Sequence, residues 1–262
     1  MLLRERRLLG GRWDRTPGGL MYARVGARPV LSGEPVVVLV HGFVISSLYM
    51  VPTAVRLAPH FAVLAPDLPG FGRSPGPRRA LTVAGLADAL AGWLTVLGLE
   101  HAVLVGNSLG CQVIAELAYR HRYPMLGAVL AGPTVDPAAR TGRQQFARLM
   151  QDWPREAPSI AAAQALDYGR AGLGRAWGTL KTAIAHPMER RLPYLTAPTL
   201  VVRGSEDPLV PDAWARRVTA LLPQGRLHVM PGAPHAVNYS AADRFAPLVA
   251  DFVRSLGPPP GA

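Results

Sequence analysis

Ser108 is the residue whose surroundings point most directly to chemistry. It stands at the centre of Gly-Asn-Ser-Leu-Gly, residues 106–110, between an apolar run at 102–105 and a helix-like pattern at 112–119. This is a G-x-S-x-G pattern between an expected strand and an expected helix. Glycines two residues to either side leave room for a sharp, strained turn that exposes the serine hydroxyl above the sheet. The pattern predicts that Ser108 is a nucleophile.

A base and an acid that could activate this serine follow downstream. Asp207 lies in a loop after the apolar run 198–202, and His235 lies in a loop after the run 226–230. In open α/β sheets, loops at the carboxyl ends of the strands form the ligand-binding edge. A serine hydroxyl needs a base to take its proton and a carboxylate to hold that base in the right tautomer. We therefore expect Ser108, Asp207 and His235 to act together as a catalytic triad.

Backbone N–H groups could bind the negative charge that develops on a substrate carbonyl oxygen. The apolar run 36–40 is followed by His-Gly-Phe, which ends at Phe43. A helix beginning directly after Ser108 leaves its first N–H groups without intrahelical acceptors. We therefore expect the backbone N–H groups of Phe43 and Leu109 to form an oxyanion hole.

The serine, the aspartate and the histidine follow one another in this order along the chain. With this order and these motifs, the chain resembles the α/β-hydrolase fold family. The resemblance runs from about Gly19 to Leu256, and Ala-Pro-Asp-Leu-Pro-Gly-Phe-Gly-Arg-Ser at 65–74 matches the family's loop after the fourth strand. It implies a serine hydrolase of α/β class. The implied core is a mostly parallel, eight-stranded sheet flanked by helices, with a helical cap inserted after the sixth strand.

Three other residues compete for roles in the triad. Asp136 and Glu206 are alternative acids, but Asp207 best matches the position at which the family places its acid. Cys111 lies three residues after Ser108, on the same face of the expected helix. A small buried thiol that packs beneath the turn is a more ordinary role for Cys111 than a second nucleophile.

Asn107 raises a second possible chemistry. Gly-Asn-Ser at this turn resembles carbon–carbon hydrolases that cleave ring-fission products. Those enzymes usually have an aromatic residue directly after the catalytic histidine and a Gly/Asn-rich oxyanion loop. Here Ala236 follows His235, and Phe-Val-Ile-Ser-Ser occupies 43–47. Both departures weaken the match, so Asn107 is expected either to contact substrate or to hydrogen-bond the backbone of the turn.

Strand-like and helix-like segments alternate along most of the chain, which predicts a mostly parallel sheet. The expected strands are residues 12–13, 20–25, 36–40, 61–65, 102–105, 125–130, 198–202 and 226–230. The expected helices are residues 48–58, 83–97, the segment after Ser108, 211–222 and 241–256, followed by a frayed tail at 257–262.

The alternation stops between residues 134 and 193, where helical patterns occur without a strand. About sixty residues are too many for an ordinary connection, so we expect a helical cap over the active site. The core would then be residues 1–133 and 194–262. Large side chains in the cap, among them Trp153, Tyr168 and Trp177, are expected to line an apolar substrate pocket.

Composition narrows the function classes. The chain has 262 residues, a formal net charge of +11, and a single cysteine, which excludes an intrachain disulfide. Its arginines are scattered rather than gathered in a stripe, so no nucleic-acid partner is expected. No run approaches the roughly 20 apolar residues of a membrane span, and the start lacks the apolar core of a secretory signal. We expect a cytoplasmic monomer or homodimer that needs no cofactor and no metal.

The predicted reaction is the hydrolysis of a small carboxylic ester through an acyl-enzyme on Ser108. The alternative enzyme is a carbon–carbon bond hydrolase of ring-fission diketones. A cap arginine that reaches inward, such as Arg170 or Arg175, would favour that acidic substrate. The alternative of another class is a non-catalytic ligand-binding module.

Overall fold

Eight strands form one sheet in the computed structural model, which describes residues 8–259. The strand order is β1-β2-β4-β3-β5-β6-β7-β8. Only the pairs β1–β2 and β2–β4 are antiparallel. This confirms the expected mostly parallel sheet. The strands are β1 (Gly10–Thr16), β2 (Gly19–Val25), β3 (Val36–Val40), β4 (Ala62–Pro66), β5 (Val103–Asn107), β6 (Gly127–Ala131), β7 (Thr199–Gly204) and β8 (Gly225–Met230).

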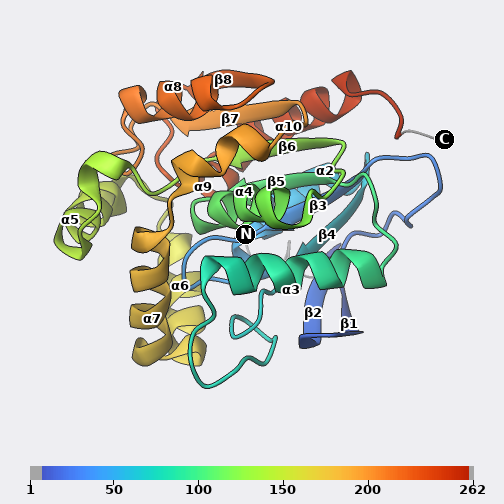
Figure 1. Cartoon of the computed structure of the whole chain (residues 1–262), viewed down its shortest axis with the longest axis horizontal. Helices are drawn as coiled ribbons and strands as arrows, with labels where there is room; N and C mark the ends of the chain where they lie inside the picture. The colour runs from blue at the N-terminus through green and yellow to red at the C-terminus, as the bar shows by residue number, and fades with distance from the viewer. Residues whose placement is uncertain (1–7, 260–262) are drawn as a thin grey trace.

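The central strands are continuous apolar runs because both faces of the sheet are covered. The covering helices are α2 (Val51–Leu57), α3 (Val83–Val96), α4 (Leu109–His121), α8 (Asp212–Leu221) and α10 (Ala242–Ser255). In β3, Val36, Val38 and Val40 pack toward α3, α4 and α8, whereas Val37 and Leu39 pack toward α2 and α10. Figure 1 shows α3 and α4 on the side of the sheet that faces the viewer.

Two helical segments differ from the sequence-based expectation. The helix expected over 48–58 is divided into a 3₁₀ turn, η2 (Ser47–Met50), and α2, which begins with Pro52 in its first turn. Proline is tolerated there because the first N–H groups of a helix have no intrahelical acceptor. A one-turn helix, α9 (Val237–Ser240), was not expected, since a segment that short carries no periodic signal.

Between β6 and β7 the chain forms helices and 3₁₀ turns only. We call residues 134–193 the cap segment. Its elements are η3 (Pro137–Ala139), α5 (Gly142–Asp152), η4 (Trp153–Arg155), α6 (Ser159–Ala171), α7 (Leu173–Ala185) and η5 (Met188–Arg190), and it ends within η6 (Leu192–Tyr194). Figure 1 shows α5, α6 and α7 gathered at one end of the sheet rather than over one of its faces. The division into a core and a separate cap domain at these boundaries stays a prediction.

The two ends of the chain lie partly outside the described residues. The expectations about the amino-terminal start and about the tail at 257–262 therefore concern residues 1–7 and 260–262, which the structure does not describe. Within residues 8–259, no helix combines the length and the apolar character that crossing a bilayer requires.

Candidate active site

Ser108 occupies a strained turn between β5 and α4. Its φ is +54° and its ψ is −115°, a backbone conformation that side chains rarely adopt. The glycines make this turn possible: a Cβ at Gly106 would lie 2.7 Å from the carbonyl carbon of Gly110, and a Cβ at Gly110 would press on the carbonyl oxygen of Val40. Ser108 is partly exposed, whereas Asn107 before it and the first residues of α4 after it are buried. The hydroxyl therefore stands above an otherwise closed turn.

Asp207 and His235 are joined by a hydrogen bond. Nδ1 of His235 donates to Oδ2 of Asp207 at 2.8 Å. The other carboxylate oxygen of Asp207 accepts the backbone N–H groups of Leu209 at 2.8 Å and Val210 at 3.1 Å. Both Asp207 and His235 are buried. The carboxylate thus holds Nδ1 in its protonated form and leaves Nε2 as the basic nitrogen.

The electrostatic surroundings favour the protonated form of His235. Burial lowers the pKa of this imidazole, but the nearby carboxylates of Asp207, Asp152 and Glu156 more than offset that effect and raise the pKa to about 9. The charged imidazolium, which forms when a base takes a proton, is therefore well stabilised.

The hydroxyl of Ser108 is within hydrogen-bond distance of Thr134, at 3.3 Å between the two oxygens. Nε2 of His235 is buried and has no hydrogen-bond partner among the described residues. A base whose acceptor atom is unpaired can accept a proton once the serine hydroxyl turns toward it. Thr134, at the start of the cap segment, was not identified from the sequence, because no motif surrounds it.

The loop after β3 lies directly beside the turn that carries Ser108. A Cβ at Gly42 would sit 3.3 Å from the Cβ of Ser108, so only a glycine lets the loop come this close comfortably. His41 fixes the loop: its Nε2 accepts the N–H of Leu68 at 3.0 Å, and its Nδ1 donates to the carbonyl of Gly42 at 3.0 Å. Burial lowers the pKa of His41, which suits the neutral ring that this pair of bonds requires.

The expected oxyanion donors are on this loop and on α4. Phe43 follows Gly42 and is half-buried, and Leu109 is the first residue of α4, where the N–H has no intrahelical acceptor. Their role in binding an oxyanion stays a prediction.

Asn107 is engaged by the protein itself. Its amide nitrogen donates to the carbonyls of Ala131 at 3.2 Å and His235 at 3.4 Å, and its side-chain oxygen accepts the hydroxyl of Tyr49 at 3.2 Å. The residue is almost completely buried. These bonds fit the second expectation for Asn107, since they tie the serine turn to the backbone of the histidine loop. Substrate contact by Asn107 stays a prediction.

The competing residues do not reach His235. Asp136 caps η3 and forms an ion pair with Arg148 at 3.0 Å, while the exposed Glu206 lies 3.9 Å from Arg155. Cys111 is fully buried, with Sγ 3.3 Å from the carbonyl oxygens of Gly106 and Ala131. Burial raises the pKa of this thiol well above its usual value, which disfavours the nucleophilic thiolate.

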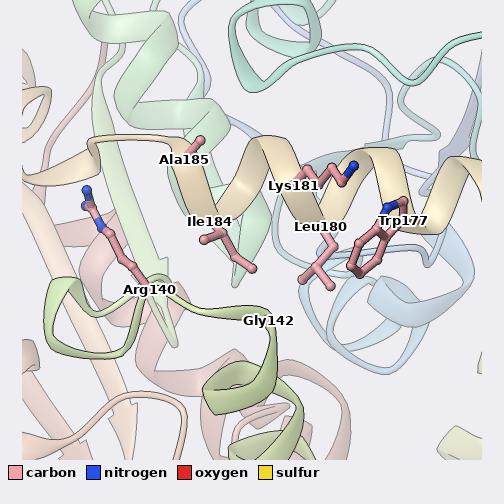
Figure 2. Close-up of a pocket in the computed structure, with 7 residues that line it drawn as sticks. All are labelled: Arg140, Gly142, Trp177, Leu180, Lys181, Ile184 and Ala185. Atoms are coloured by element: carbon pink, nitrogen blue, oxygen red, sulfur yellow. The ribbon is translucent and has the colours of Figure 1, made fainter.

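The aromatic residues of the cap segment are less enclosed than a pocket wall would require. Trp153 and Trp177 are 47% and 57% exposed, and Tyr168 is half-buried against the core. Trp177 lines an open cleft of about 480 Å³ with Leu180 and Ile184. Figure 2 shows these side chains on α7, facing the segment that leads into α5. No triad residue lines this cleft. Substrate contact by the three aromatic residues stays a prediction.

The two cap arginines considered in the sequence analysis have different surroundings. Arg170 is exposed at the end of α6. Arg175 lies against the backbone of Gly70 and donates to the carbonyl of Pro77 at 2.8 Å. Arg175 therefore holds the loop after β4.

Three carboxyl groups of the cap segment, the buried Asp152 and Asp167 and the half-buried Glu156, contact the loops after β3 and β8. Sequence reasoning assigned no role to any of them. Asp167 of α6 accepts the backbone N–H of Ser46 at 2.9 Å and its hydroxyl at 2.7 Å. Asp152 accepts the N–H of His235 at 3.1 Å, and Glu156 accepts the N–H of Ala236 at 2.7 Å. Their only sequence signal is an acidic side chain within a helical segment, which is also typical of an exposed helix face.

Comparisons with known proteins agree with this architecture. A curated relative, 2-(acetamidomethylene)succinate hydrolase from Mesorhizobium japonicum, is 28% identical over 244 residues, covering 84% of this chain and 88% of that protein. Among solved structures, a thermophilic esterase from Thermogutta terrifontis with malate bound has a TM-score of 0.77 at 24% identity, covering 94% of this chain and 99% of that chain. A carboxylesterase from Bacillus subtilis has a TM-score of 0.77 at 20% identity, covering 97% and 96%.

The family model described as the alpha/beta hydrolase family matches residues 37–248, which include the serine turn, Asp207 and His235. That match extends over well more than half of the 262 residues. The chain is therefore a member of the α/β-hydrolase family and a hydrolase of that class.

Proposed function

We propose that this hydrolase cleaves small, neutral carboxylic esters of short to medium chain through an acyl-enzyme formed on Ser108. One observation carries the proposal. Nδ1 of His235 is bonded to Asp207 at 2.8 Å while Nε2 is buried without a partner among the described residues. Ser108 is held in a strained turn whose preceding residue, Asn107, bonds the carbonyl of His235 at 3.4 Å. That arrangement fits nucleophilic acyl transfer, in which a base must accept the serine proton.

The reaction would proceed in two halves. Ser108 attacks the acyl carbon as His235 takes its proton, and the N–H groups of Phe43 and Leu109 bind the oxyanion. The imidazolium of His235, stabilised by Asp207, then protonates the leaving alcohol. In the second half His235 activates water, which releases the acid and restores the hydroxyl of Ser108.

The environment of the arginines supports a neutral substrate. Arg170 is exposed and Arg175 bonds the loop after β4, so neither is positioned to meet a substrate carboxylate. A carbon–carbon hydrolase that acts on an acidic diketone remains the alternative enzyme. The curated relative from Mesorhizobium japonicum is named for a succinate derivative, which supports this acidic-substrate alternative.

A substrate series tests the proposal. We expect p-nitrophenyl esters from acetate to octanoate to be hydrolysed with saturation and an optimum at short to medium chain length. A vinylogous diketone acid should be turned over at least about a hundredfold more slowly, a difference of roughly 3 kcal/mol in transition-state binding. Faster turnover of the diketone would contradict the ester assignment.

Covalent labelling separates both enzymes from a non-catalytic binding module. A fluorophosphonate should attach to Ser108 in the native protein and fail to attach after His235→Ala, because labelling needs the activated hydroxyl. Failure of the native protein to label would favour the binding module.

A further inference from the structure

The loop that carries His235 is held by two acids from a distant part of the chain. The backbone N–H of His235 donates to Asp152 at 3.1 Å, and the next N–H, that of Ala236, donates to Glu156 at 2.7 Å. Asp152 ends α5, and Glu156 follows η4. Two consecutive N–H groups are thus bonded to the cap segment, about eighty residues earlier in the sequence. Displacing this part of the cap segment would leave both donors unpaired.

The two acids are also bonded to each other, which requires a shared proton. Their side chains form a mutual hydrogen bond. Burial raises the pKa of both acids, and the bond acts against that rise in Asp152 but adds to it in Glu156. Burial, followed by the charge of Asp152, raises the pKa of Glu156 to about 8. At neutral pH, Glu156 is therefore the protonated partner and Asp152 the carboxylate. Glu156 also accepts the hydroxyl of Ser240.

We propose that Asp152 and Glu156 form a proton-sharing carboxyl pair through which the cap segment positions His235 and tunes its basicity. This inference rests on the proposed function only in taking His235 as the catalytic base. Asp152 and Glu156 are positioning residues: they bond the backbone of the histidine loop, and nothing requires them to touch substrate. At neutral pH Glu156 contributes geometry and adds its charge only as pH rises past its own pKa of about 8, whereas Asp152 contributes both geometry and a negative charge.

Among the titratable groups that face the acid pair, His235 is the cation that the charge of Asp152 stabilises. Asp207 approaches from the loop after β7, and the hydroxyl groups of Tyr49 on η2 and Tyr239 on α9 lie in the same electrostatic neighbourhood. Arg155, on η4, is directed to the exposed Glu206 at 3.9 Å. Asp152 therefore acts with Asp207 to stabilise the imidazolium of His235.

Two conservative substitutions separate geometry from charge. Asp152→Asn keeps an oxygen that can accept the N–H of His235 but removes the charge. Glu156→Gln keeps both the acceptor for Ala236 and a donor for Asp152, whereas Glu156→Ala removes both. Glu189→Gln is the matched control, because Glu189 is a cap-segment acid that pairs with Arg140.

Kinetics and NMR should distinguish the geometric contribution from the electrostatic one. We expect Glu156→Ala to lower kcat about tenfold with KM within about twofold, and Glu156→Gln to stay near the wild-type value. Asp152→Asn should shift the acidic limb of the kcat/KM profile, and the NMR titration of the His235 imidazole, to lower pH by about one unit. Glu189→Gln should change neither.

The outcomes that would overturn the inference are distinct from those that would overturn the function. An unshifted His235 titration in Asp152→Asn, or equal losses in Glu156→Gln and Glu156→Ala, would contradict a positioning pair. Because the NMR titration needs no substrate, it tests the pair even if no ester is hydrolysed. Absence of ester hydrolysis by the wild-type protein would contradict only the proposed function.

Discussion

The two halves of the candidate active site are held in place by different physical means. The serine turn is determined locally, by a positive φ at Ser108 and by glycines at 106 and 110 that allow the backbone to close. The histidine loop is held by side chains from elsewhere, with Asp207, Asn107 and the acid pair of the cap segment each bonded to it. Sterics fix the nucleophile, whereas charge and hydrogen bonding fix the base. The two halves should therefore fail under different perturbations.

The largest expected effect is on the serine side, where chemistry and folding can be separated. Ser108→Ala removes the nucleophile and only one oxygen atom, so we expect kcat to fall about 10⁴-fold or more. The urea midpoint should change little, because the turn is formed by the backbone. Steady-state kinetics with a p-nitrophenyl ester and urea unfolding provide the two readouts. Retained turnover, with loss instead in Cys111→Ala, would show that the nucleophile is wrongly assigned.

On the histidine side, Asp207→Asn should cost nearly as much. An asparagine at this position can donate to Nδ1 and so stabilise the wrong tautomer of His235, and we expect kcat to fall about 10⁴-fold. The neighbouring Glu206→Gln is the control and should stay within a few-fold of wild type, since Glu206 is exposed and only loosely paired. A severe loss in Glu206→Gln with a mild one in Asp207→Asn would transfer the acid role to Glu206.

Gly106→Ala should damage the serine side through folding. The added methyl group would lie under 3 Å from the backbone of Gly110, and overpacking of this kind costs about 2 kcal/mol. Urea denaturation should report this loss of unfolding free energy. Gly169→Ala, at an open position inside α6, is the control and should be neutral or slightly stabilising. Equal stability of the two variants would mean that the turn is not sterically constrained.

Raising the pH should weaken the histidine side. The pKa of folded His235, about 9, exceeds its ordinary value of 6.5, so the folded state binds more protons than the unfolded state between these values. The free energy of unfolding should therefore fall as pH rises from about 6.5 to 9. The raised pKa of Glu156 acts in the same direction from 4.5 to about 8. Urea titrations across this range should show a shallower decline in Asp152→Asn and an unchanged slope in Gly106→Ala.

The smallest expected effect lies outside both halves, at the open cleft. Trp177 is more than half exposed, so Trp177→Ala should change the unfolding free energy by only about 0.5 kcal/mol. If its ring contacts the acyl chain, the preferred ester length should still shift by a few-fold in relative kcat/KM. Unchanged chain-length selectivity in Trp177→Ala, Trp153→Ala and Tyr168→Ala would exclude these aromatic residues from the substrate pocket.

The same contrast explains what the sequence could predict. The sheet and its strands could be predicted because each buried strand is a short apolar run, and the serine turn because its constraints lie within five consecutive residues. The proximity of Asp207 and His235 follows from their places after parallel strands. Asp152 and Glu156 could not be assigned, because the position of a helical segment over the core depends on packing that helical periodicity does not encode. The bond between Asn107 and the histidine loop could not be predicted for a related reason: its acceptor, the His235 carbonyl, is 128 residues away.

Cys111 provides a built-in reporter of how often the serine turn opens. The thiol is sealed beneath the turn, with Sγ directed to the carbonyls of Gly106 and Ala131, and it is the only cysteine of the chain. A thiol reagent can reach it only after α4 separates from β5, so the modification rate measures the population of that opened state. Acylation of Ser108 modifies the same turn. Comparing the modification rate of Cys111 with and without a stable acyl or phosphonyl adduct would therefore show whether the acyl-enzyme opens this turn more or less often than the free enzyme.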